Sequence, residues 1–291
     1  MSRVTEDRPV PQATALRVVR ELDEGPWAEF VDHHPHGSIF HTPEMYRVLE
    51  RTRHHRPSVW AAVAGDEIRA LMTVVEIATL GGPLRPLTSR SVAFATPLAL
   101  DGSDGEPTLQ ALLGAYRRRS SRIPLFTEIR NHVDASCMEA QLAHSEFRHE
   151  RHLNFLVDLT PSEDELWARV SSSSRRNIKK ARRMEVTIDL AADHSEAAGA
   201  YEILRDVYHR IQVPLPDRSL FDASFDILGP LGRFRLLIAS VEDRPIGALS
   251  LLLYKDVVYY WYTGTLREYA GHRAGDLLVW QAIIDLSLIH I

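Results

Sequence analysis

Two segments of this 291-residue chain share one pattern, and that pattern constrains the fold more than any other feature of the sequence. Residues 61–71 (AAVAGDEIRAL) and residues 239–249 (ASVEDRPIGAL) align at an offset of 178, and each places two strand-like runs around a short turn. This pattern is typical of an antiparallel β-hairpin. Two helices are expected before each hairpin, and a strand and then a helix after it. Such hairpins are common, so coincidence is the alternative, but the shared order of elements favours duplication.

The first half is expected to combine short helices with antiparallel strands. Thr42 is a good N-cap residue and Pro43 suits the first helical position, so a helix is expected to begin there. Gly65 and Asp66 supply the tight turn of the first hairpin. Helices are expected at residues 27–31, 42–49, 108–120 and 135–147, and strands at residues 59–64, 67–77, 91–100, 123–130 and 153–159.

The second half repeats this alternation. Thr160 and Glu163 match a T-x-x-E capping box with Pro161 between them, which predicts a helix that ends near Met184. Further helices are expected at residues 194–211, 221–228 and 275–284, and strands at residues 186–190, 234–241, 246–254 and 257–263. The chain exceeds the roughly 100 to 200 residues of a typical domain, so we expect two domains, at residues 13–152 and 153–291.

The second copy of the repeat is shorter than the first. After Ile68 the first half runs on to Asp158, whereas only residues 247–291 follow Ile246. We therefore expect the second domain to be truncated at its C-terminus, with residues 286–291 (LSLIHI) resembling a translated sequencing adapter. A strand and one or two helices would then be absent, and an exposed apolar edge would favour aggregation.

A cluster of basic residues stands out in a chain whose formal net charge is −5. Six of the nine residues at positions 175–183 are Arg or Lys. Such a local excess predicts a site for anions, most plausibly phosphates. The alternative is a solvated helix face, because Lys and Arg are good helix formers and cations at a helix C-terminus also complement its dipole.

Composition narrows the class of protein. Apolar residues at 45% and charged residues at 25% are typical of a globular protein. Cys137 is the only cysteine, so no internal disulfide can form and a cytoplasmic location is expected. The first fifteen residues lack the apolar core of a signal peptide, and no apolar run reaches the roughly 20 residues of a membrane-spanning helix.

Several common chemistries are not supported by the sequence. The histidine-rich segment 33–41 has neither the aspartate of an HHxxxDG motif nor a metal-binding spacing such as H-E-x-x-H, so no metal is expected. The serines at 171–174 have no G-x-S-x-G surroundings. Neither a Walker loop nor G-x-G-x-x-G occurs, which leaves ATP and dinucleotide enzymes without support.

Two motifs indicate a family. Residues 27–43 read W-x-x-F-V-x-x-H-P-x-G-S-I-F-H-T-P, and residues 175–183 read R-R-x-I-K-K-A-x-R before a short strand. Together with the duplication, they resemble the Fem-type peptidoglycan aminoacyl transferases and the BioF2-like acetyltransferases of the GNAT superfamily. The resemblance extends from Leu16 to Asp285. It implies an α/β fold of tandem GNAT-like domains, each a mixed, mostly antiparallel sheet flanked by helices.

The resemblance also implies an activity. Fem-type enzymes transfer an amino acid from aminoacyl-tRNA to a cell-wall precursor, and GNAT relatives use acetyl-CoA, so the donor here would be aminoacyl-tRNA or an acyl-CoA. The acceptor would be a primary amine of a small-molecule or lipid-linked cell-wall or glycan precursor; neither a metal nor DNA is implied. The alternative is a non-enzymatic module whose basic helix binds RNA or an anionic membrane surface.

Donor-binding residues follow from the same resemblance. Arg175, Arg176, Lys179 and Lys180 match the basic helix of the pattern, and their side chains suit phosphate groups. Arg273 lies in residues 266–276 (LREYAGHRAGD), near an expected helix start. This segment lacks the R/Q-x-x-G-x-G/A spacing with which GNAT acetyltransferases bind the pyrophosphate of CoA, which favours the Fem-like donor without excluding acetyl-CoA.

Aminolysis of an ester or thioester requires a neutral amine, donors for the developing oxyanion and a proton for the leaving group. The strand at 257–263 is expected to carry this chemistry, with Tyr260 and Tyr262 on one face as candidate acids; buried core aromatics are the alternative. Glu128 and Arg130 form an E-x-R pair that could bind an acceptor carboxylate or steer its amine. A structural salt bridge is the alternative for this pair.

Overall fold

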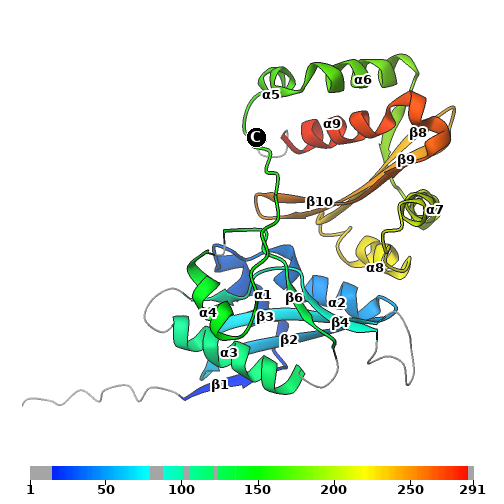
Figure 1. Ribbon diagram of the computed structural model, residues 1–291. Helices are drawn as coiled ribbons and strands as arrows, with labels where there is room; N and C mark the ends of the chain where they lie inside the picture. Colours follow the sequence, from blue (N-terminus) through cyan, green and yellow to red (C-terminus); the bar gives the residue numbers. More distant parts are fainter. Residues whose placement is uncertain (1–14, 79–87, 101–104, 121–123, 135, 288–291) are drawn as a thin grey trace, which may run out of the picture.

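The computed structural model of the protein describes residues 15–78, 88–100, 105–120, 124–134 and 136–287. Its strands form two separate β-sheets, one in each half of the chain, and helices flank both sheets (Figure 1). The predicted organisation of two similar α/β units is therefore present in the described residues.

The first sheet has the strand order β1-β2-β3-β4-β6, with β5 paired to β3. All of its pairs are antiparallel except the parallel pair of β4 and β6. The strands are β1 (Leu16–Val19), β2 (His55–Ala64), β3 (Glu67–Ala78), β4 (Ser89–Ala93), β5 (Leu98–Ala99) and β6 (Thr127–Ile129). The helices are α1 (Glu24–His33), α2 (Pro43–Arg51), α3 (Gly105–Ser120) and α4 (Glu139–His144), with short 3-10 turns η1 (Ile39–His41) and η3 (Ser136–Met138).

The second sheet has the strand order β10-β9-β8-β7 and is antiparallel throughout. Its strands are β7 (Thr187–Leu190), β8 (Phe234–Val241), β9 (Arg244–Tyr254) and β10 (Val257–Thr265). The helices of this half are α5 (Glu163–Arg169), α6 (Ser172–Arg183), α7 (His194–Arg210), α8 (Ser219–Ile227) and α9 (Ala274–Ser287), with the 3-10 helix η4 (Arg267–His272) before α9.

The two halves repeat one order of elements. The run β1, α1, α2, β2, β3, β4 in the first half corresponds to β7, α7, α8, β8, β9, β10 in the second. Both hairpins contain a register shift two residue pairs beyond the turn. The turn residues are 65–66 and 242–243, so the hairpins superpose at an offset of 177. The predicted offset of 178 is wrong by one residue, because matching residue types along the two segments does not reproduce the strand pairing that defines the turns.

Turn geometry explains the residues at these positions. Gly65 has a φ of 65°, in the left-handed region that glycine adopts without strain. The second turn uses Glu242 and Asp243, with φ of 48° and 58°, and two consecutive positive φ values are typical of the type I′ hairpin turn.

Three apolar clusters order the molecule into layers. One lies between the first sheet and α3, and another between the second sheet and the helices α5, α6 and α9. The third joins α1 and α2 of the first half to α7 and α8 of the second, so it lies between the two sheets. Figure 1 shows α5, α6 and α9 on one face of the second sheet and α7 and α8 on the other. The two halves therefore share one central core.

Polar contacts reinforce this junction. The ammonium group of Lys255, in the β9–β10 turn, donates to the carbonyl oxygens of Val31 (2.9 Å) and His34 (2.8 Å) at the end of α1. The neighbouring Tyr254 hydroxyl donates to the Asp32 carboxylate. A cation at the C-terminus of a helix satisfies carbonyl groups that have no partner within the helix. These contacts fix the orientation of the second sheet relative to α1.

The predicted strand at residues 153–159 is wrong. These residues form no strand, and Leu153 and Phe155 are 91% and 85% exposed. Their apolar alternation predicts a half-buried strand only if a neighbouring strand pairs with it, and none does among the described residues.

The predicted helix from Thr160 to Met184 is two helices with different caps. Ser162, not Thr160, caps α5, and its capping-box partner is Glu165 rather than Glu163. Thr160 instead hydrogen-bonds to Asp158. The chain breaks after α5, and Ser171 caps α6. The basic cluster therefore covers most of a short helix rather than the last turns of a long one.

The ends of several other strands and helices differ from those predicted. The strand expected at 91–100 is divided between β4 and β5, and the strand expected at 123–130 is limited to Thr127–Ile129; residues 121–123 lie outside the described residues. The helix expected at 135–147 comprises η3 and α4, with residue 135 outside the described part, and α3 starts three residues earlier than expected. In each case the type of element was predicted and its ends were not, which is the usual weakness of local patterns.

Candidate active site at the domain junction

Strand β10 has an irregular register at its centre. Tyr260 pairs with Leu251, but Tyr262 pairs with Ser250, so Trp261 is an extra residue that forms a β-bulge. The prediction that Tyr260 and Tyr262 share one face is wrong, because a bulge interrupts the alternation of side chains. The rings of Trp261 and Tyr262 instead lie side by side, with centroids 5.0 Å apart, while Tyr260 is 53% exposed.

Ser250 holds this bulge. Its hydroxyl accepts a hydrogen bond from the Tyr262 amide (3.0 Å) and donates to the Tyr262 carbonyl (3.2 Å). Ser250 is fully buried, so both backbone groups of Tyr262 would lose a partner without it. The bulge is therefore a specified feature of β10, and bulges are frequent beside active sites.

Aromatic side chains surround Tyr262. Its ring packs against Phe221 of α8 (centroids 5.4 Å apart) and Tyr208 of α7 (5.9 Å). Burial raises the pKa of Tyr262 above its ordinary value, and the nearby Tyr208 raises it further. A phenol in this environment keeps its proton at neutral pH, which is the state that a proton donor needs.

Glu128 and Arg130 form an ion pair beside β10. The Nε atom of Arg130 lies 2.8 Å from Oε1 of Glu128, and its guanidinium stacks over the Phe94 ring at 5.4 Å. Arg130 is close enough to Tyr262 for its charge to lower the pKa of that phenol. The two side chains are 38% and 42% exposed, so the pair contributes little to stability and remains open to solvent. Arg130 of the predicted acceptor pair therefore lies within electrostatic range of one predicted tyrosine.

Sequence reasoning missed three rings at this junction. Tyr259 of β10 lies with its ring 5.1 Å from Phe40 of the first half and 5.4 Å from His132. His132 itself stacks on Phe40 at 5.5 Å. The only sequence signal for His132 was its position two residues after Arg130.

His41 has a structural role. It is fully buried, and its Nε2 atom lies 2.9 Å from the Thr96 carbonyl while Nδ1 accepts from the Ser38 amide. Burial lowers the pKa of His41 to about 4, so it is neutral at physiological pH. With both ring nitrogens engaged, His41 fixes the turn before α2.

The basic helix, α6, packs against α9 on the face of the second sheet that is opposite to α7 and α8 (Figure 1). Arg175 donates from Nη1 to the carbonyl oxygens of Trp167 and Ala168, each at 3.2 Å, and thereby caps α5. Arg176 and Lys179 are exposed, and Lys180 is partly exposed. Arg175 thus has an internal partner, whereas the other predicted phosphate ligands face solvent.

The start of α9 adjoins α6. The Asn177 amide donates to the carboxylate of Asp276 in the first turn of α9 (3.2 Å). Arg273, an exposed residue with a φ of 59°, immediately precedes α9. Backbone amides at a helix start attract anions, and here cationic side chains lie nearby. Asp276 does not fit an anion-binding site, because its own negative carboxylate lies in the first turn of α9.

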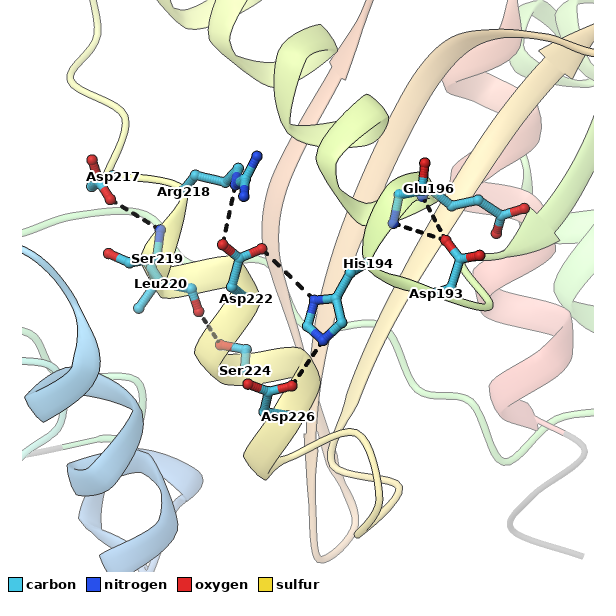
Figure 2. A network of polar contacts seen from close by, with 11 residues as sticks. Asp193, His194, Glu196, Asp217, Arg218, Ser219, Leu220, Asp222, Ser224 and Asp226 are labelled. Carbon is cyan, nitrogen blue, oxygen red and sulfur yellow. Dashed lines mark hydrogen bonds and ion pairs between the residues drawn. The ribbon is translucent and has the colours of Figure 1, made fainter.

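One polar network lies away from this junction. His194, at the start of α7, contacts Asp226 (2.9 Å) and Asp222 (4.0 Å) of α8, as Figure 2 shows. The Asp222 carboxylate also accepts a hydrogen bond from Arg218. In the described part of the chain no group of three or more His, Cys, Asp or Glu residues is arranged to hold a metal ion. This network therefore ties α7 to α8.

Two other features of the molecule are a cavity and the length and apolarity of its described helices. A cavity of about 380 Å³ lies between α1 and the first hairpin turn, lined by residues that include Phe30 and Glu67, and all of its lining residues belong to the first half of the chain. Among the described helices, none has the length and apolarity needed to cross a bilayer.

Comparison with known proteins agrees with this architecture. Residues 168–287 match the family model described as "Acetyltransferase (GNAT) domain", a segment that includes α6, β10 and α9. No curated protein matches the chain.

Solved structures resemble nearly the whole chain. The crystal structure of FemX superposes with a TM-score of 0.66 at 12% identity, over 93% of this chain and 85% of FemX. A tandem GNAT protein from the clavulanic acid biosynthesis pathway superposes with 0.52 at 13% identity, over 95% and 86%. The C-terminal domain of a putative lysylphosphatidylglycerol synthetase from Agrobacterium fabrum gives 0.53 at 10% identity, over 91% and 74%. Such low identities establish the fold, and the predicted tandem GNAT-like fold is confirmed.

Proposed function

We propose that this protein is an N-acyltransferase that moves an acyl or aminoacyl group from a phosphate-bearing donor to a primary amine. The observation that carries the proposal is the bulge in β10, held by Ser250 and followed directly by η4 and the start of α9. This run lies within the segment that matches the GNAT domain. A strand irregularity for the reacting carbonyl and a helix start for phosphates are the two parts that such a donor needs.

The acyl carbon would lie beside the bulge at Trp261. Attack by an amine converts the carbonyl oxygen into an oxyanion, which backbone N–H groups at an irregular strand can stabilise. The leaving group, a thiolate or a ribose hydroxyl, needs a proton. Tyr260 and Tyr262 are the proposed donors; both phenols are protonated at neutral pH, and burial raises the pKa of each.

The donor phosphates would bind Arg176, Lys179, Lys180 and Arg273, with Arg175 holding α5 in place. The twelve residues of α6 extend over roughly 18 Å, which exceeds the span of one pyrophosphate. An extended cationic face of this length favours a large polyanion, so aminoacyl-tRNA is the preferred donor and acyl-CoA the second choice. Either donor implies a cytoplasmic reaction.

The acceptor would approach from the first half of the chain. The exposed pair of Glu128 and Arg130 offers a cation for an acceptor carboxylate and an anion for its ammonium group. A peptide stem or amino sugar of a peptidoglycan or other glycan precursor carries both kinds of group. We propose such a precursor as the acceptor.

Donor binding provides the first test. Thermal-shift measurements with acetyl-CoA, aminoacyl-tRNA and uncharged tRNA would show which ligand stabilises the protein, because a ligand at 100 times its Kd adds about 2.7 kcal/mol. Lys179→Glu should abolish that shift, whereas the matched charge reversal Arg210→Glu, at an exposed residue of α7, should not. Binding of any RNA with strong salt dependence and without transfer would instead favour a non-enzymatic anion-binding module.

A further inference from the structure

His132 is placed at the junction between the two halves of the molecule. It follows β6, and its ring contacts both Phe40 of η1 and Tyr259 of β10, with centroids at 5.5 Å and 5.4 Å. Tyr259 precedes the bulge residue Trp261 by two positions. The imidazole therefore lies beside the strand that would hold the acyl group and two residues from Arg130, which would hold the acceptor.

A neutral imidazole at His132 can act as a base. It carries one N–H group and one nitrogen whose lone pair can accept a proton. The backbone of Phe94 raises the pKa of His132, but this effect is smaller than that of burial. Burial lowers the pKa of His132, and Arg130 lowers it further, so the ring is neutral at physiological pH.

Two other histidines near the junction are almost fully buried, and both ring nitrogens of each have a polar contact. His41 is 1% exposed, with one nitrogen near the Thr96 carbonyl and the other near Ser38. His34 is 8% exposed, contacts the Ala99 carbonyl through one nitrogen, and accepts a backbone amide with the other. His132 is only partly buried, so solvent or a substrate can reach it.

We propose that His132 is the general base that removes the proton from the acceptor amine in the transfer reaction, a proposal that rests on the function proposed above. The attacking nitrogen forms a bond to the acyl carbon and gives its proton to the unprotonated nitrogen of His132. The bond from that carbon to the leaving oxygen or sulfur breaks, and the leaving group takes the electron pair. The proton on His132 then passes to the leaving group or to solvent, and the imidazole is restored.

Neighbouring groups define the expected pH dependence. Arg130 on the same segment disfavours the imidazolium form, and Glu128 is ion-paired with that arginine. From η1, His41 is neutral in this range, and from β10, Tyr259 has a pKa raised by burial and stays protonated. His132 is therefore the group among these that changes charge in mildly acidic solution.

The experiment measures acyl transfer by the full chain from aminoacyl-tRNA, and separately from acetyl-CoA, to two acceptors as a function of pH. One acceptor is a lysine-containing peptide, and the other is hydroxylamine, whose weakly basic nitrogen loses its proton to water readily once it has attacked the acyl carbon. His132→Gln should lower kcat with the peptide ~100-fold or more, the usual contribution of a general base, and should remove the acidic limb of the profile. Transfer to hydroxylamine should fall far less. His209→Gln, an exposed substitution on α7, is the control.

The outcomes separate the two proposals. If the unmodified protein transfers to neither acceptor from either donor, the function proposed above is wrong and the assignment of His132 falls with it. If it transfers but His132→Gln keeps both the rate and the acidic limb with the peptide, only the assignment of His132 is wrong. An equal loss with both acceptors would show that His132 positions the junction and does not remove a proton. Circular dichroism and a melting curve of the variant exclude misfolding as the cause.

Discussion

The third strands of the two repeated units differ in one respect. In the first unit, β4 pairs with β3 in continuous register and continues into the parallel pair with β6. In the second unit, β10 pairs with β9 across a bulge at Trp261. The same scaffold therefore has a regular strand in one copy and an irregular one in the other. We infer that the second copy holds the donor, while the first contributes acceptor-facing groups such as Arg130 and His132.

The two hairpins also differ in the role of one hydroxyl residue at corresponding positions. Thr73 and Ser250 correspond at the structural offset of 177. The Thr73 hydroxyl donates to the Phe40 carbonyl at 2.7 Å and ties β3 to η1. The Ser250 hydroxyl instead ties β9 to the bulge in β10. A hydroxyl at one site of the repeat thus serves packing in one copy and strand geometry in the other.

The largest expected effect concerns the core that the two units share. Phe221 is 1% exposed and belongs to the cluster between the sheets. Phe221→Ala should destabilise the protein by about 3–5 kcal/mol because it leaves a cavity in that cluster. Calorimetry should still record a single transition, since both halves contribute to the cavity walls.

The control for this experiment is Leu112→Ala, which removes a buried side chain from the cluster beneath α3, confined to the first half. Two separate transitions in the Phe221 variant would contradict a shared core and would make the halves independent domains.

The next effect concerns acid stability of the first unit. His41 has a pKa of about 4 when folded, below the 6.5 of an exposed histidine, so the unfolded chain binds a proton more readily. Stability should be complete above pH 6.5 and fall as the pH approaches 4, by about 3 kcal/mol from the 2.5-unit difference. Denaturant titrations at several pH values measure this slope. His41→Gln should flatten it, and the exposed His36→Gln should leave it unchanged.

A smaller effect tests the bulge. Ser250→Ala removes both hydrogen bonds to buried backbone groups and should cost about 1–3 kcal/mol. The Tyr262 amide should exchange faster with solvent, measured by NMR or mass spectrometry. Thr73→Val should lower stability without changing that amide. Equal exchange of Tyr262 in both variants would show that the bulge does not depend on Ser250.

The smallest effect concerns the segment that joins the units. Ser162→Ala should lower stability by about 1 kcal/mol because it removes the N-cap of α5. Thr160→Ala should change it less, since Thr160 contacts only the exposed Asp158 in the described residues. A melting temperature that responds more to Thr160 than to Ser162 would restore the capping box expected from the sequence.

Local patterns predicted elements well where local interactions decide them. The hairpin of β8 and β9 follows from strand propensity around a turn, and α2 from Thr42 and Pro43. The same reasoning failed at residues 153–159, where an alternating apolar pattern has no paired strand among the described residues. It also failed at Ser162, because two overlapping capping motifs compete and only chain geometry selects between them.

The parts of the candidate site that depend on residues close in sequence were predicted, and the parts that depend on distant residues were not. Glu128 and Arg130 were recognised as a pair because they are two residues apart, and they form that pair. The bulge that separates Tyr260 from Tyr262 depends on Ser250, which is distant in sequence and has no motif. Arg175 stays a predicted phosphate ligand, and only the structure showed that its Nη1 atom donates to carbonyl groups at the end of α5.

The sequence by itself determined the duplication, the type of most elements and the location of the basic cluster, since periodicity, turn residues and charge are local properties. Only the tertiary structure decided that both halves share a core, that β10 contains a bulge, and that His132 of one half lies beside Tyr259 of the other. These features arise from contacts between residues far apart in the chain. Such contacts depend on how the layers pack, which a local pattern does not encode.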